Sequence, residues 1–277
     1  MRLANAACYF DRMVCEDAYD PSAPTFKGQF DLFDDTKRDG LTAERRILSA
    51  APNVEIPLRR VITTGGHSWL IGNDMPDMFA DEVIRNKYVL HRADSLAVIK
   101  TFDQILTGAA GTAAYASRVW VKGSKQVDTD STVFDEFDIY FSPSEAVQDK
   151  HMVLLEGAWH LVRAVYPTQA GLVSALSEEL PNPLESGTLN LRTYAPVTDT
   201  YTSSPLAVSV LRIRWQVNFT YRTVGTPTYL RGDESVVLLK SAAMPKVGDT
   251  LSLGDGTWRV QGVLDEGLCW NLHTRRA

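Results

Sequence analysis

A short strand unit centred on tryptophan occurs three times in the chain and is the feature that most limits its fold. In each unit a turn glycine is followed by a tryptophan and then by apolar residues, at residues 66–72, 157–162 and 256–262. Glycine adopts the positive φ angle that tight turns need, and tryptophan gives the return strand a large apolar face. We therefore predict three β-hairpins whose tryptophans, Trp69, Trp159 and Trp258, occupy equivalent core positions.

Further strands are predicted on both sides of each hairpin. An aromatic residue in a strand-like segment precedes each tryptophan by about 40 residues, and these residues are Phe30, Trp120 and Trp215. Apolar and polar residues alternate over residues 211–222, which is the period of a half-buried strand. Closing strands are predicted at residues 88–91, 174–177 and 270–273. Because a lone hairpin cannot bury itself, each repeat is predicted to be a small barrel or sandwich of about five strands.

The predicted fold class is mainly β, with three consecutive small antiparallel barrel or sandwich modules, one short connecting helix and extended arms. The predicted segments are an N-terminal arm over 1–23, module 1 over 24–93, the connecting helix over 94–112, module 2 over 113–180, a linker or arm over 181–207 and module 3 over 208–277. Apolar residues at helical spacing between Ser95 and Leu106, followed by Gly108, predict the helix. Four prolines and many serines and threonines between residues 181 and 205 predict a linker without a core of its own.

Composition agrees with a folded protein and disfavours several functional classes. Hydrophobic residues make up 44% of the 277 residues and charged residues 22%, which is ordinary globular usage. No apolar run approaches the ~20 residues of a membrane-spanning helix, and acidic residues interrupt the N-terminal segment before a signal peptide could form. The net charge of −6 disfavours a dedicated nucleic-acid binder. We therefore expect synthesis in the cytoplasm and no membrane association.

No residue pattern points to catalysis or to a bound metal. The three cysteines, Cys8, Cys15 and Cys269, lack the C-x-x-C spacing of a zinc ribbon and leave an odd count for disulfides. The five histidines, His67, His91, His151, His160 and His273, lack metal-ligand spacing, and two of them, His91 and His273, fall at matching repeat positions. The Ser68 turn lacks the glycine of a nucleophile elbow. We expect a protein without catalytic residues, cofactor or metal.

One basic surface is predicted on the long strand before the third hairpin. Alternation places Arg212, Arg214 and Arg222 on the same face of this strand. The face is either a solvated outer surface or a surface that meets an acidic partner or a nucleic-acid backbone.

The sequence of the third module resembles the small-barrel head-closure and head–tail joining proteins, also called connectors or adaptors, of tailed bacteriophages. The residues that carry the resemblance are the apolar run 236–239, Pro245, the Gly248-Asp249-Thr250 sequence, Gly256 and the Trp258-Arg259-Val260 strand. The resemblance covers residues 208–277, with fainter internal copies over 113–180 and 24–93. Members of this family usually contain one module, and the second copy has Asp149-Lys150 without the preceding glycine.

The resemblance implies a virion structural protein that is synthesised in the host cytoplasm and forms a homo-oligomeric ring, a hexamer or dodecamer, between portal and tail. It implies portal and tail proteins as partners, passing contact with genomic DNA, no cofactor, and a ring that lines or seals the DNA channel. The extended arms would clasp neighbouring subunits. Deleting residues 183–203 is therefore expected to leave the modules folded but to abolish assembly. The competing hypothesis is a ligand-binding or adhesion module, such as another tail or capsid surface component. Its glycan or protein contacts would come from exposed tyrosines: Tyr166, Tyr194, Tyr201 and Tyr229.

Overall fold

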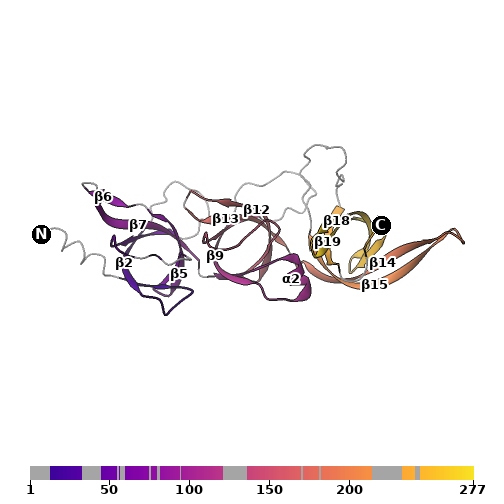
Figure 1. The fold of residues 1–277 in the computed structure, drawn as a ribbon, viewed down its shortest axis with the longest axis horizontal. Helices are drawn as coiled ribbons and strands as arrows, with labels where there is room; N and C mark the ends of the chain where they lie inside the picture. The colour runs from indigo at the N-terminus through magenta and orange to yellow at the C-terminus, as the bar shows by residue number, and fades with distance from the viewer. Residues whose placement is uncertain are drawn as a thin grey trace. The chain divides into compact units, whose positions relative to one another are not determined.

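The described part of the chain forms three closed antiparallel β-barrels of six strands each and one short helix (Figure 1). The computed structural model describes residues 13–32, 45–54, 56, 60–74, 76–79, 82–93, 95–120, 136–169, 171–180, 182–213, 233–240 and 244–277. The predicted fold class of three small antiparallel barrels is confirmed. Each barrel contains one strand more than the sequence predicts, and that additional strand closes it.

Each barrel is built from strands that follow one another in the chain. The first barrel contains β1 (Met13–Asp17), β2 (Phe26–Leu32), β3 (Arg45–Ala50), β4 (Val61–Thr64), β5 (His67–Asp74) and β7 (Glu82–Arg92), with β6 (Asp77–Phe79) paired to β7 outside the closed ring of strands. The second contains β8 (Ser95–Lys100), β9 (Thr112–Trp120), β10 (Glu136–Phe141), β11 (Met152–Leu155), β12 (Ala158–Pro167) and β13 (Val173–Leu180). The third contains β14 (Leu184–Ala195), β15 (Thr200–Ile213), β16 (Asp233–Leu239), β17 (Thr250–Leu253), β18 (Gly256–Glu266) and β19 (Cys269–Arg276).

All three barrels share one order of strand pairing. The first strand pairs with the second and the second with the third, which then pairs with the last strand. The last strand pairs with the return strand of the tryptophan hairpin, and the hairpin's incoming strand closes the barrel on the first strand. Closure leaves no open sheet edge in the barrel wall. The tryptophan unit is therefore part of a complete barrel repeat.

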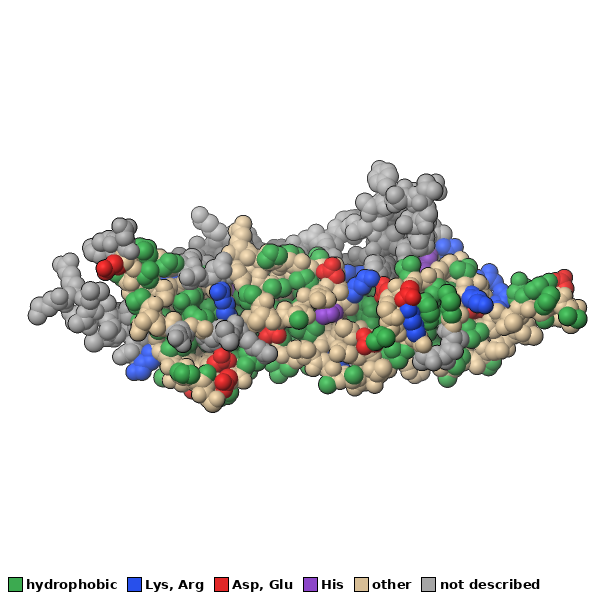
Figure 2. All heavy atoms as spheres, viewed as in Figure 1, with side chains coloured by type: hydrophobic (Ala, Val, Ile, Leu, Met, Phe, Trp, Pro, Cys, Tyr) green, Lys and Arg blue, Asp and Glu red, His purple; other side chains and the backbone are tan. Residues whose placement is uncertain are grey.

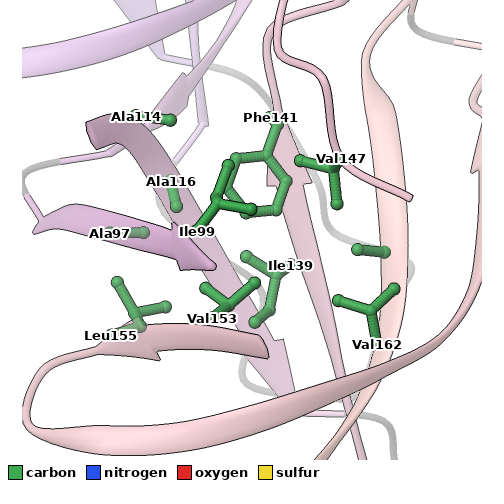
Figure 3. Packing of buried hydrophobic residues seen from close by; sticks show 11 residues of the cluster. Ala97, Ile99, Ala114, Ala116, Ile139, Phe141, Val147, Val153, Leu155 and Val162 are labelled. Atoms are coloured by element: carbon green, nitrogen blue, oxygen red, sulfur yellow. The ribbon is translucent and has the colours of Figure 1, made fainter. Parts of the chain in front are cut away.

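The interior of the second barrel illustrates how alternation fills these cores (Figure 3). Ile139 and Phe141 of β10 face inward with Ile99 of β8, Val153 of β11 and Val162 of β12, and all five are buried. The intervening residues of β10 face outward because successive strand side chains alternate between the two faces. The barrel interior is a packed core.

The chain forms two compact units, one with the first and second barrels and one with α2 (Phe102–Thr107) and the third barrel. Within the first unit, the two barrels are joined through Tyr19. Its hydroxyl donates to Glu145 Oε1 at 2.8 Å and accepts from the Tyr115 N–H at 2.9 Å. Around it, Val61, Leu70, Ala93 and Leu172 form a buried apolar cluster. Within the second unit, α2 packs on β15 and β16.

The predicted N-terminal arm and connecting helix both contain a barrel strand. In the segment 1–23, β1 places Cys15 in the core of the first barrel. In the segment 94–112, the first half is β8, because Ala97 and Ile99 follow the strand period into the core of the second barrel. The helix begins only after Thr101, and Gly108 ends it at a φ of 72°, as predicted.

The predicted linker over 181–207 is instead a long β-hairpin. Strands β14 and β15 pair from Leu184–Leu211 to Ala195–Thr200, and Leu189 is buried in the third core. The described prolines are compatible with this hairpin. Pro183 precedes β14, Pro196 lies in the turn, and Pro205 lies at a position of β15 whose backbone nitrogen does not need to donate a hydrogen bond to β14. The third barrel therefore starts at Leu184. Deleting residues 183–203 would remove β14 and the start of β15, so the expectation that this deletion leaves the modules folded is wrong.

Gly187 of β14 packs closely against β17, the neighbouring strand in the wall of the third barrel. A Cβ atom at this position would lie 2.6 Å from Leu253 Cδ2 and 2.7 Å from the Ser252 carbonyl oxygen. We expect Gly187→Val to destabilise the second unit by about 1–3 kcal/mol, because the backbone oxygen cannot yield. Urea unfolding followed by circular dichroism measures this change. Gly262→Ala is the control, since its Cβ would meet His273 Cβ at an ordinary 3.6 Å; equal losses in both variants would contradict the prediction.

Candidate interaction surface

The tryptophans of the predicted repeat core divide into two groups. Trp69 and Trp258 are 5% and 4% exposed and belong to the first and third cores. Trp159 is half-buried and faces outward. Trp120 lies in β9, but its side chain is not described, and Trp215 lies outside the described residues. The predicted equivalence of the three hairpin tryptophans is therefore wrong for Trp159.

Hairpin register explains the difference. Each hairpin has a two-residue turn, and the strand residues that flank the turns are 64 and 67, 155 and 158, and 253 and 256. Trp69 and Trp258 are the third residues of their return strands, whereas Trp159 is the second residue of its return strand. A shift of one residue moves a side chain to the opposite face of a strand. His160 therefore takes the inward position in the second barrel and is fully buried.

The buried histidines and cysteines have environments that make them poor functional groups. Burial lowers the pKa of His160 and of His91 to about 4, with nearby Arg118 and Arg45 adding to the respective effects. Burial also raises the pKa of the Cys15 thiol to about 12 and that of Cys269 to about 11, so neither is a thiolate at neutral pH. Among the described residues, no three His, Cys, Asp or Glu side chains gather as metal ligands would.

The predicted arginine face is represented in the described residues by Arg212 alone, since Arg214 and Arg222 lie outside them. The Arg212 side chain is 12% exposed and forms ion pairs with the carboxylates of Glu185, Glu234 and Asp255. Its guanidinium also lies 4.9 Å from the ring centroid of Trp258. Burial opposes the charge of Arg212, yet the carboxylates of Glu234 and Asp255 raise its pKa overall. Arg212 therefore stabilises the barrel and offers no free charge to a partner.

The exposed feature of the third barrel is the outer half of the β14–β15 hairpin. β14 pairs with β17 only over Thr188–Asn190, and β15 pairs with β16 only over Val210–Ile213. Beyond these pairings the two strands continue together and project from the barrel (Figure 1). Figure 2 shows hydrophobic side chains gathered at the end of this hairpin.

Aromatic residues and one arginine form the outer face of the hairpin tip. Tyr194 and Tyr201 are direct cross-strand partners with ring centroids 5.2 Å apart, and they are 48% and 62% exposed. The Arg192 guanidinium lies 4.5 Å from the Tyr201 centroid, and the Tyr194 hydroxyl donates to Asp199 Oδ1 at 2.7 Å. Val197 in the turn is 97% exposed. These five residues are called the tip surface below.

The backbone edges of the hairpin are partly blocked. The Arg212 N–H donates to the Pro183 oxygen, so these two residues form a hydrogen-bonded pair at the start of the β14–β15 ladder. Hydrogen-bonded and non-hydrogen-bonded pairs alternate along an antiparallel ladder, which makes Asn190 and Pro205 a non-hydrogen-bonded pair. The Pro205 nitrogen therefore points away from β14. Proline carries no N–H, so that edge lacks a donor there. On the other edge, the outward Arg192 N–H donates to Asp249 Oδ1 at 2.8 Å. The tip therefore presents exposed side chains, whereas part of its backbone edge is unavailable for strand addition.

Sequence reasoning identified Tyr194 and Tyr201 as exposed aromatics but missed Arg192, Val197 and Asp199. The signal that would have found them is the alternation of Leu189 and Leu191 with polar neighbours before a four-residue turn. The prolines of the same segment outweighed that signal. Of the other two tyrosines in the adhesion hypothesis, Tyr166 donates to Asp138 Oδ1 at 2.6 Å and Tyr229 lies outside the described residues.

Comparison of the chain with protein-family models, curated proteins and solved structures finds no match. In the part of the chain that the structure describes, no helix has the length and apolar character needed to cross a membrane.

Proposed function

We propose that the chain is a non-enzymatic structural protein of a tailed phage virion. In this role it forms an oligomeric ring at the head–tail interface, joins portal and tail, and lines or seals the DNA channel. The observation that carries the proposal is the β14–β15 hairpin, which projects from a closed barrel and keeps its aromatic residues exposed. Exposed aromatic and arginine side chains are the residue types that dominate protein interfaces.

The residues of the family resemblance support the proposal through their structural roles. The Gly248-Asp249 sequence holds the projecting hairpin to the third barrel, because the buried Asp249 carboxylate accepts the N–H groups of Arg192 and Lys246 at 2.8 and 2.7 Å. Gly248 has a φ of 96°, which favours glycine. The motif thus acts as an anchor for an assembly arm.

A second candidate function, glycan binding at the exposed tyrosines, has less support from the same geometry. Glycan binding on an aromatic side chain needs an open ring face. The Arg192 guanidinium lies 4.5 Å from the centroid of the Tyr201 ring. The Tyr194 ring packs against the same Tyr201 ring, with the two centroids 5.2 Å apart. The tip surface is therefore better suited to a protein partner than to stacked sugar.

Native mass spectrometry and negative-stain microscopy of the full chain test the proposal. We expect closed rings of one stoichiometry, a hexamer or a dodecamer. Antibodies against the chain are expected to label the neck of intact phage particles. A protein that stays monomeric at high concentration and binds glycans saturably would contradict the connector function.

A further inference from the structure

The tip surface carries its two charges at opposite ends of its aromatic pair. Arg192 and Asp199 are the only charged residues within the range 186–211. The Arg192 guanidinium contacts the Tyr201 ring, Tyr201 packs on Tyr194, and the Tyr194 hydroxyl donates to Asp199 Oδ1. These contacts place all four side chains on one face of the hairpin, in the order cation, two rings, carboxylate.

The two charges are evenly spaced about the rings. Arg192 lies two residues before Tyr194 on β14, and Asp199 lies two residues before Tyr201 on β15. Tyr194 and Tyr201 are direct partners on antiparallel strands, so the two charged residues lie about 7 Å from the tyrosine pair in opposite directions along the hairpin. A two-fold axis that crosses the hairpin at the tyrosine pair therefore brings the cationic end of one copy to the acidic end of another.

Both charges are available to a partner. Within the described residues neither side chain forms an ion pair, and both residues are exposed. Arg192 Nη1 lies 3.4 Å from the Gly248 carbonyl oxygen, which is a long hydrogen bond, and the Asp199 carboxylate accepts one hydroxyl. A guanidinium has five N–H donors and a carboxylate accepts several hydrogen bonds, so each group can engage a further partner.

The opposite face of the same hairpin offers no such pattern. The residues of the outer half that alternate with the tip residues carry neither a charge nor an aromatic ring, and they are Thr193, Ala195, Thr200, Thr202 and Ser204. The charged and aromatic face is therefore the one suited to docking.

We infer that the tip surface of one copy binds the tip surface of a second copy in antiparallel orientation, about a two-fold axis. Arg192 of each copy then meets Asp199 of the other, and the tyrosine rings of the two copies pack together. A parallel arrangement would bring the two arginines together and the two carboxylates together, which is unfavourable.

This pairing lies beyond the proposed ring, because a two-fold contact joins two copies and does not by itself build a cyclic assembly. Where the copies already belong to rings, it joins two rings through one contact per copy, so a dodecamer would consist of two hexamers. A single tip contact is small, but several that form together act at a high effective concentration.

Charge reversal in the full chain tests the pairing by sedimentation equilibrium. Arg192→Glu alone and Asp199→Lys alone put like charges together at both ends of the contact, so each is expected to weaken pairing by at least about tenfold. An equimolar mixture of the two single variants should restore pairing as a mixed species, and one chain with both changes should restore it as a like pair. Thr193→Glu, on the opposite face of the hairpin, is the control and should pair as the wild type does.

Rescue by mixing is the decisive readout, because a role of either residue within its own chain would not produce it. Tyr194→Ser with Tyr201→Ser gives a variant that leaves both charges in place, and it is also expected to weaken pairing by at least about tenfold. Leu264→Ser is its control, since Leu264 is 46% exposed on β18 of the same barrel. Circular dichroism and thermal melting verify that each variant is folded.

The outcomes separate the pairing from the connector function. Pairing that survives both charge reversals, or a mixture that fails to pair, would overturn the inference. Single rings that never pair would overturn it as well while leaving the connector function standing. Pairs that respond to the variants as expected, without any ring, would support the tip contact and contradict the ring. A wild-type monomer at every concentration would overturn both.

Discussion

Replacing Arg212 with methionine is expected to destabilise the third barrel by about 3 kcal/mol, because it leaves three carboxylates without their shared cation. Glu185, Glu234 and Asp255 come from β14, from β16 and from the turn between β17 and β18, and each pairs with Arg212. The Glu234 side chain is 11% exposed and the Asp255 side chain 43%, so solvent screens part of the loss. Urea unfolding at pH 7 measures the change.

Two further variants separate charge from packing at this site. Methionine retains much of the aliphatic contact with Trp258, so the loss should be mainly electrostatic. Adding Glu234→Gln to Arg212→Met should recover part of the stability, because one uncompensated carboxylate is removed. Arg259→Met, at an exposed position of β18, is the control and should change stability by less than about 0.5 kcal/mol. An Arg212→Met protein as stable as this control would refute the structural role.

The arginine face shows where sequence reasoning reaches its limit. Strand alternation correctly places Arg212 on the wall of the third barrel, but its burial depends on carboxylates that are far from it in the chain. Glu185 lies 27 residues away and Asp255 lies 43 residues away. Charge patterning along one strand cannot show such convergence, so an arginine that bridges three elements has the same sequence signature as a solvated one.

The sequence analysis missed the sixth strand of each barrel for a similar reason. The tryptophan hairpins and closing strands carry strong turn and apolar signals, which is why the fold class was predictable. The first strands are weaker: β1 has five residues, of which only Cys15 is buried, and β14 contains Gly187 and follows a proline. Their place is fixed by barrel closure, a tertiary requirement that overrides local propensity.

Register is the other property that composition does not show. Gly157 is the last turn residue of its hairpin, whereas Gly256 is the first residue of its return strand, so a shared Gly-x-Trp spacing aligns positions that are not equivalent. The consequence is that a histidine occupies the inward position where the other two barrels have tryptophan. His160 packs edge-on against Phe137 with centroids 5.3 Å apart, and neither of its ring nitrogens has a hydrogen-bond partner in the described structure.

The two buried histidines of the first unit, His91 and His160, predict that this unit loses stability in mild acid. His91 and His160 have folded-state pKa values of about 4, below the ordinary value of 6.5, because burial disfavours the charged ring. The unfolded chain therefore binds more protons than the folded chain between those pH values, so stability is complete above about pH 6.5 and falls as the pH decreases toward 4. Each histidine is expected to cost roughly 3 kcal/mol over this range.

Urea unfolding of the wild type at pH 7 and pH 4.5 should show this loss, and two variants assign it to titration. His160→Leu removes both the proton site and the unpaired nitrogens, whereas His160→Gln removes the proton site but stays polar. Both should reduce the difference in unfolding free energy between the two pH values by roughly 2–3 kcal/mol, and His160→Leu should be the more stable at pH 7. Lowered carboxylate pKa values, such as that of Asp255 beside Arg212, act below pH 4 and leave this window unaffected. An unchanged pH dependence in His160→Leu would mean that the ring is not held neutral by burial.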